Sequence, residues 1–80
     1  MQGSWRIVRR EHRLEVDVDQ DVTEEATTEL AVALASELDD DVLEVELSSN
    51  LPNDSPVFYD LVRTVGGITN GSGKAFRIRR

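Results

Sequence analysis

A polar turn at residues 49–55, with the first residues that follow it, carries the side chains best suited to binding chemistry. Its amides, carboxylate and hydroxyls can hydrogen-bond to backbone groups or to a partner. Ser55 followed by Pro56 is typical of a helix start, because Ser accepts a hydrogen bond from a free N–H and Pro has no N–H to lose. A helix N-terminus can also receive an anion or a carboxylate. The sequence therefore predicts a partner-binding site formed by Asn50, Asn53, Asp54, Ser55 and Tyr59.

Catalytic chemistry has little support in the sequence. His12 is the only histidine and there is no cysteine, so no metal-ligand cluster and no thiolate nucleophile is indicated. Ser55 has no base that the sequence places beside it. Gly71-Ser72-Gly73-Lys74 lacks the upstream Gly and the helix start of a phosphate-binding loop. We expect a non-enzymatic protein with no catalytic residue, metal or cofactor.

Alternating apolar and charged residues predict the strands that position this turn. Strands are expected at residues 5–8, 14–19, 43–48 and 74–79, and Leu43 is expected to point inward with Val45 and Leu47. The first two are predicted to form a hairpin, with one long bent strand as the alternative.

Two amphipathic helices are predicted between these strands. The first opens at Asp21, with Glu24 three positions on in a capping-box-like arrangement, and runs to Leu38. The second starts at Pro56 and is predicted to stop at Gly66-Gly67, so that residues 68–73 form a loop. Together the elements predict one domain over residues 1–80.

The predicted fold class is α/β in the wider sense, an α+β two-layer arrangement in the order β-β-α-β-α-β. Right-handed crossovers between parallel neighbours place both helices on one face of a four-stranded mixed sheet. The other face is left open, which explains why the strands alternate and are not apolar throughout. That open face is expected to carry Arg from the outer strands and acids from the inner ones.

Charge is segregated along the chain. Residues 1–13 have a net charge of +3, residues 14–62 of −15 and residues 63–80 of +5, giving −7 in total. One interpretation is intramolecular neutralisation between neighbouring strands. A basic partner or a high-salt source would also explain an acidic middle. Asp39-Asp40-Asp41 is likewise open to two interpretations, a solvated turn or a contact with a cation or basic partner.

The central stretch resembles STAS domains, the fold of bacterial anti-sigma-factor antagonists. Glu46-Leu47-Ser48, a loop, Asp54-Ser55 and an apolar helix through Leu61-Val62-Arg63 are similar to that family's core, and Asp21-Val22-Thr23 is similar to its first strand-to-helix step. The family's usual phosphoacceptor position holds Pro56 here, and Val57 replaces the following Gly. Ser55 is then the only nearby hydroxyl that could accept a phosphate. STAS domains also usually carry a further helix and strand, so this chain looks short beside them.

The resemblance implies a regulatory protein–protein interaction domain. Its partner would be an anti-sigma factor or an ATP-binding kinase-fold protein. The alternative is a nucleic-acid or self-association module, including a homodimer, that uses the basic terminal strands. The acidic middle argues against nucleic acid. A cytoplasmic location is expected, because the sequence shows neither a signal peptide nor a membrane-spanning run.

Overall fold

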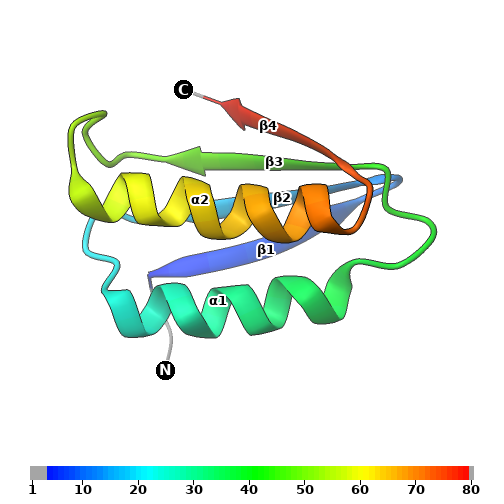
Figure 1. Ribbon diagram of the computed structural model, residues 1–80, viewed down its shortest axis with the longest axis horizontal. Helices are drawn as coiled ribbons and strands as arrows, with labels where there is room; N and C mark the ends of the chain where they lie inside the picture. The colour runs from blue at the N-terminus through cyan, green and yellow to red at the C-terminus, as the bar shows by residue number, and fades with distance from the viewer. Residues whose placement is uncertain (1–3, 80) are drawn as a thin grey trace.

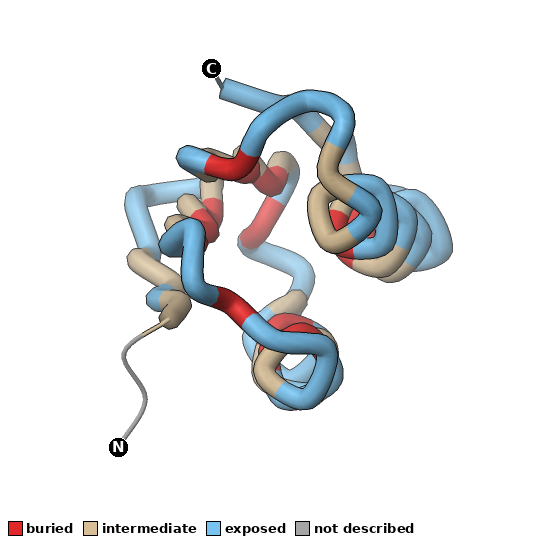
Figure 2. The backbone as a smooth tube through the Cα atoms, turned by 90° about the vertical axis from the view of Figure 1, so that its left-hand side faces the viewer, coloured by how far each residue is buried: buried red, intermediate tan, exposed pale blue. Residues whose placement is uncertain are grey.

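The computed structural model describes residues 4–79. Its elements, in order, are β1 (Trp5–Arg10), β2 (Arg13–Val18), α1 (Glu24–Glu37), β3 (Glu44–Ser49), α2 (Pro56–Gly71) and β4 (Ala75–Arg79). The strands form one mixed sheet in the order β1-β2-β3-β4, in which β1 is antiparallel to β2 and the later pairs are parallel. Both helices cover the same face of the sheet (Figure 1; Figure 2). The predicted fold class is confirmed.

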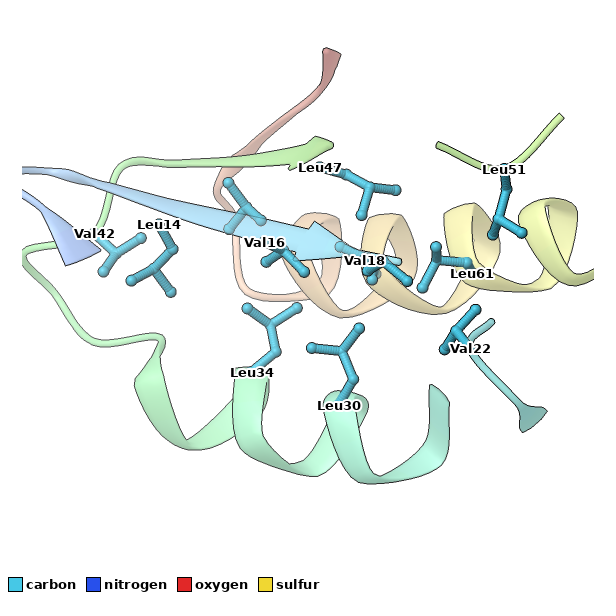
Figure 3. Close-up of a cluster of buried hydrophobic side chains, with 12 residues drawn as sticks. Leu14, Val16, Val18, Val22, Leu30, Leu34, Val42, Leu47, Leu51 and Leu61 are labelled. Carbon is cyan, nitrogen blue, oxygen red and sulfur yellow. The ribbon is translucent and has the colours of Figure 1, made fainter. Parts of the chain in front are cut away.

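The core lies between the two inner strands and the helices. Leu14, Val16 and Val18 on β2 alternate with charged residues and point toward the helix layer, because successive side chains of a strand face opposite sides. The parallel register sets Leu14 beside Val45 and Val16 beside Leu47. Figure 3 shows Leu30 and Leu34 of α1 pointing toward these β2 side chains. Burial of this one apolar layer holds the helices on the sheet.

The β1–β2 connection is a hairpin and not one bent strand. Arg10 pairs with Arg13, so Glu11 and His12 form a two-residue turn. Glu11 has φ 48, the left-handed conformation that short hairpin turns require. The sequence offers no Gly or Asn there, so a hairpin and one long bent strand are both compatible with it.

The cap of α1 differs from the prediction. Thr23, and not Asp21, is the N-cap, and its hydroxyl accepts a hydrogen bond of 3.1 Å from the Ala26 backbone N–H. Asp21 instead lies in a turn in which the Val22 N–H donates to the Asp19 carbonyl. Since Val22 is buried, packing of its side chain fixes this turn and moves the helix start two residues along the chain.

The end of α2 is also corrected, because the helix continues through Gly66-Gly67 to Gly71. The helix ends in a Schellman motif: the Gly73 N–H donates to the Asn70 carbonyl and the Lys74 N–H to the Thr69 carbonyl, both at 3.0 Å. Gly73 has φ +76 and is the left-handed residue of this motif. The predicted loop at residues 68–73 is therefore mostly helix.

Gly66 has a packing role inside α2. A Cβ added at this position would lie 3.2 Å from two ring carbons of Phe76 on β4. The missing side chain therefore lets the helix and the edge strand approach closely. This requirement for space, and not for a special backbone conformation, accounts for a Gly in the middle of the helix.

The start of β3 shifts by one residue from the expected position. Leu43 is 61% exposed, whereas Val42 is completely buried. The Leu43 N–H bonds to the His12 carbonyl at 2.7 Å, which ties it to the hairpin turn before the regular alternation begins. The prediction that Leu43 points inward is therefore wrong, while those for Val45 and Leu47 are confirmed.

The face of the sheet opposite the helices carries the predicted charge pattern. Arg6 pairs with Asp17 at 3.2 Å, and Arg77 pairs with Glu44 at 3.4 Å. Glu15 lies between Arg10 and Arg13, with ion pairs of 3.1 and 2.9 Å. Basic side chains of the terminal segments thus neutralise acids of the inner strands within the chain. This supports the intramolecular interpretation of the segregated charge.

Candidate functional site

The predicted site lies where the inner parallel strands end. The turn after β3 and the loop between β2 and α1 are at the same end of the sheet, on the left of Figure 1. In open sheets with parallel strands, ligands bind outside the carboxyl ends of the strands. The topology therefore puts residues 50–59 at an edge suited to recognition.

Short hydrogen bonds shape the turn itself. The Ser49 hydroxyl accepts a hydrogen bond of 3.0 Å from the Leu51 N–H, and Leu51 is buried below the turn. The Ser55 N–H donates to the Pro52 carbonyl at 3.1 Å. An apolar anchor and local backbone bonds thus hold the turn in one conformation, with Asn50, Asn53 and Asp54 exposed on it.

Ser55 is the N-cap of α2. Its hydroxyl accepts from the Phe58 N–H at 3.4 Å, and Pro56 occupies the first helical turn, as the sequence predicted. The side chain is part of a half-buried residue. The same hydroxyl that could accept a phosphate therefore already satisfies a helix N–H.

Three of the five predicted site residues line two separate shallow depressions, and Asn53 and Ser55 line neither of the two. Asn50 lines one of them together with Asp19, Gln20 and Asp21. Asp54 and Tyr59 line the other, on the outer side of the first two turns of α2. The second depression is lined by Asp54, Pro56, Tyr59, Asp60 and Arg63, and we call it the Tyr59 surface. The five predicted residues therefore do not converge on one point.

Tyr59 is the dominant feature of the Tyr59 surface, because it is 65% exposed. Asp60 and Arg63 flank it, and neither was predicted as a site residue. Their spacing is a signal that the sequence does contain, since residues four apart on a helix are neighbours and Tyr59 is followed by Arg63. An exposed aromatic ring beside an acid and a base is suited to contact with a protein surface.

The carboxyl groups whose pKa departs from the ordinary value lie away from this site. The pKa of Glu15 is lowered, chiefly because Arg10 donates a hydrogen bond to its carboxylate, with further stabilisation by the charges of Arg10 and Arg13. The pKa of Asp39 is lowered, chiefly because Arg9 donates a hydrogen bond to it. In both cases an ion pair with arginine lowers the pKa: on the open face of the sheet for Glu15, and at the other end of the sheet for Asp39.

The first of the three consecutive aspartates, Asp39, contacts basic groups of the chain itself. Arg9 lies 2.9 Å from Asp39, and the Lys74 ammonium donates to the Asp39 backbone carbonyl at 2.8 Å. The Asp41 N–H bonds to the Asp39 carboxylate at 3.0 Å. Cations from β1 and from the turn before β4 thus offset the negative C-terminal end of α1.

A hollow at the opposite end of the sheet is lined mainly by basic residues. It is lined by Arg9, Arg10, Glu11, His12, Arg13, Leu43 and Glu44. His12 contacts the Asp41 carbonyl through Nδ1 at 3.0 Å, and the arginines are engaged with acids of the chain. Within residues 4–79, no group of three or more His, Asp or Glu side chains is placed to hold a metal ion. No helix in the same range is long and apolar enough to cross a membrane.

Comparisons with known proteins give no match: no protein-family model, curated protein or solved structure is similar to this chain.

Proposed function

We propose that this chain is a non-enzymatic regulatory domain that docks a partner protein through the turn and helix start at residues 50–59. The single observation that supports this function most is the exposure of Tyr59 on the first turns of α2. Exposed tyrosines on rigid elements are favoured at interfaces, because a large ring is buried there at a low cost in side-chain entropy.

The partner class in this proposal comes from the resemblance to anti-sigma-factor antagonists. The partner would be an anti-sigma factor or an ATP-binding protein of the kinase fold. Ser55 is the candidate phosphoacceptor, since Pro56 has no hydroxyl. A phosphate there would lie at the N-terminus of α2 and add negative charge beside Asp54 and Asp60, which would repel an acidic partner surface.

The structure gives less support to a module that binds through its basic strands. Arg6, Arg9, Arg10 and Arg77 are each paired with an acid of the chain. Binding a nucleic acid would require these pairs to exchange for phosphate contacts, next to the carboxylates that the arginines now neutralise. We therefore retain protein docking as the proposed function.

The test is photo-crosslinking in the source cell with a benzophenone amino acid placed at position 59. The matched control carries the same group at position 32, because Val32 is 67% exposed on α1 and so resembles Tyr59 in accessibility. The proposal expects a defined adduct from position 59 that is absent from position 32. Mass spectrometry of the adduct would identify the partner class.

A second arm examines the polar residues of the site. Asp54→Lys and Tyr59→Ala are expected to weaken binding of the identified partner, while Val32→Ala leaves it unchanged. Circular dichroism must show that all three variants are folded. Adducts of equal yield from both positions, or binding unaffected by Tyr59→Ala, would place the function elsewhere.

A further inference from the structure

The outer edge of β4 is the second feature of the molecule suited to binding. β4 is the last strand of the sheet, and its pairing with β3 leaves its other side at the edge. The Ala75 N–H bonds to the Leu43 carbonyl at 3.1 Å, so Ala75 directs its backbone groups toward β3. Because backbone direction alternates along a parallel pair, the N–H and C=O groups of Phe76 and Ile78 point to the outer edge. An exposed row of backbone N–H and C=O groups at a sheet edge can pair with another strand.

Side chains on this edge define what such a strand must look like. On the open face, Arg77 and Arg79 are both exposed, and Arg79 makes no ion pair within the described part of the chain. On the helix side, Phe76 is half-buried under Gly66 and Ile78 is 43% exposed. A strand that matches both sides would alternate acidic and apolar residues.

The chain already shows this match on the other side of β4. β3 places Glu44 and Glu46 on the open face and Val45 and Leu47 on the helix side. In the register of the sheet, Glu46 stands beside Arg77, and Glu44 forms an ion pair with Arg77 at 3.4 Å. A segment of similar pattern would find the same complement of side chains on the free edge.

A second copy of this chain fits the edge poorly. Antiparallel pairing of β4 with itself about its centre would set Arg77 opposite Arg77, and like charges directly opposite each other destabilise a strand pair. β1 is the other edge of the sheet and contains Arg6, Arg9 and Arg10, so pairing of β1 with β4 would also bring basic strands together. The positive charge on both edges thus disfavours self-association and favours an acidic segment.

We propose that the free edge of β4 binds an extended segment of a partner protein in which acidic and apolar residues alternate. The partner segment adds a fifth strand, with its acids beside Arg77 and Arg79 and its apolar side chains beside Ile78. This surface is separate from the Tyr59 surface and does not depend on the function proposed for that surface.

The experiment titrates the folded, isotope-labelled chain with a capped peptide that has the sequence of residues 43–48, Leu-Glu-Val-Glu-Leu-Ser. The control peptide has Lys in place of both Glu residues. Backbone amide shifts and hydrogen exchange report where each peptide binds. We expect the resonances of the Phe76 and Ile78 amides to shift and these amides to gain protection from hydrogen exchange. The Lys peptide is expected to bind at least about fivefold more weakly than the acidic peptide.

Two variants separate backbone pairing from charge. Ile78→Pro removes an edge N–H that the sheet does not use, and Pro is tolerated on edge strands in this orientation, so the fold should persist while peptide binding is lost. Ile78→Val is its matched control and should still bind. Arg79→Glu keeps the backbone edge and should remove the preference for the acidic peptide, because the new carboxylate offsets the charge of Arg77.

Several results would overturn the proposal. The first is no shift at β4 with the acidic peptide at millimolar concentration, and the second is equal binding of the acidic and Lys peptides. Retained binding by a folded Ile78→Pro variant would exclude strand addition. Shifts spread over β2 would mean that the peptide displaces β3, and shifts confined to residues 50–59 would assign the peptide to the Tyr59 surface. If the crosslinker at position 59 gives no adduct, the outcome of the peptide titration at β4 is unaffected. The two proposals can therefore fail independently.

Discussion

The Nη2 atom of Arg9 lies 2.9 Å from both carboxylate oxygens of Asp39, which joins the end of β1 to the end of α1. Arg9 is opposite Leu14 in the hairpin register, so its side chain is on the helix side of the sheet. A second contact, at 3.7 Å to Glu37, adds to the pair. An edge strand and a helix that are 28 to 30 residues apart in sequence are thus held by charge where the apolar core ends.

Replacing Arg9 with Met is expected to lower the urea midpoint of unfolding, because the Asp39 carboxylate loses its ion pair and the C-terminal end of α1 loses one of its two cations. Arg6→Met is the matched control, since Arg6 is also on β1 and also pairs with an acid. Its side chain is 73% exposed, against 38% for Arg9. The control should have the smaller effect, and both effects should shrink in high salt. Equal effects of the two substitutions would contradict a special role for Arg9.

Acid is expected to destabilise the domain through Glu15 and Asp39. The pKa of each carboxyl is lower in the folded chain than its ordinary value, so the unfolded state takes up protons first as the pH falls. This stabilisation is fully present above about pH 5 and is lost as the pH falls through the lowered folded pKa values. Thermal unfolding between pH 7 and pH 3 measures the loss.

Glu15→Gln provides the control for that pH dependence. The variant should be less stable than the wild type at pH 7 and should approach it as the pH falls through the lowered pKa of Glu15, where the carboxyl becomes protonated in the folded state as well. Glu29→Gln alters an exposed acid on α1, and its stability should change with pH nearly as that of the wild type does. A constant difference between wild type and Glu15→Gln across this range would remove Glu15 from the explanation.

Gly67→Ala is expected to stabilise the domain by about 0.5–1 kcal/mol, because Gly67 lies inside α2 and a Cβ there meets nothing within 4 Å. Gly66→Ala should gain less or lose stability, since its Cβ would press on the Phe76 ring. Urea unfolding of the pair measures the difference. A helix that ended at Gly66-Gly67 would instead place Gly67 outside the helix, and Gly67→Ala would then bring no gain from helix propensity.

Gly73→Ala is expected to destabilise the domain by about 1–2 kcal/mol, because Gly73 has φ +76 and a Cβ is strained in that conformation. Gly73→Asn should cost less, since Asn tolerates the left-handed region better. Open space surrounds the position, so crowding cannot explain a loss. Thermal melts in which Ala and Asn behave alike would argue against the Schellman motif as the cause.

Ser55→Ala is expected to cost about 1 kcal/mol of stability, because the helix loses its N-cap acceptor. Ser55→Asp retains an acceptor and should keep most of that stability. The comparison separates the cap from any role of the hydroxyl in modification: if Ser55 is phosphorylated, neither variant can be modified, although only one is destabilised. Equal losses for both variants would show that the cap is not the source.

The alternation in the sequence predicted the sheet, its inward residues and the open charged face. Local signals of this kind depend on burial on one side of a strand, which is a property of each short segment. The second helix start was also predictable, because Ser55 and Pro56 act on their own backbone. The predictions at Leu43, Asp21 and Gly66-Gly67 were wrong, because each depends on a contact with a segment far along the chain.

The sequence by itself determined the fold class, the core stripe and the turn at residues 50–59, since period and turn chemistry are local. Only the tertiary structure decided that Gly66 is helical, because the close approach of Phe76 gives the Gly its role. It also decided that Asp39 meets Arg9, and that Asn50 and Tyr59 line different depressions. These relationships depend on how strands and helices pack in three dimensions, which one sequence does not encode in any local spacing.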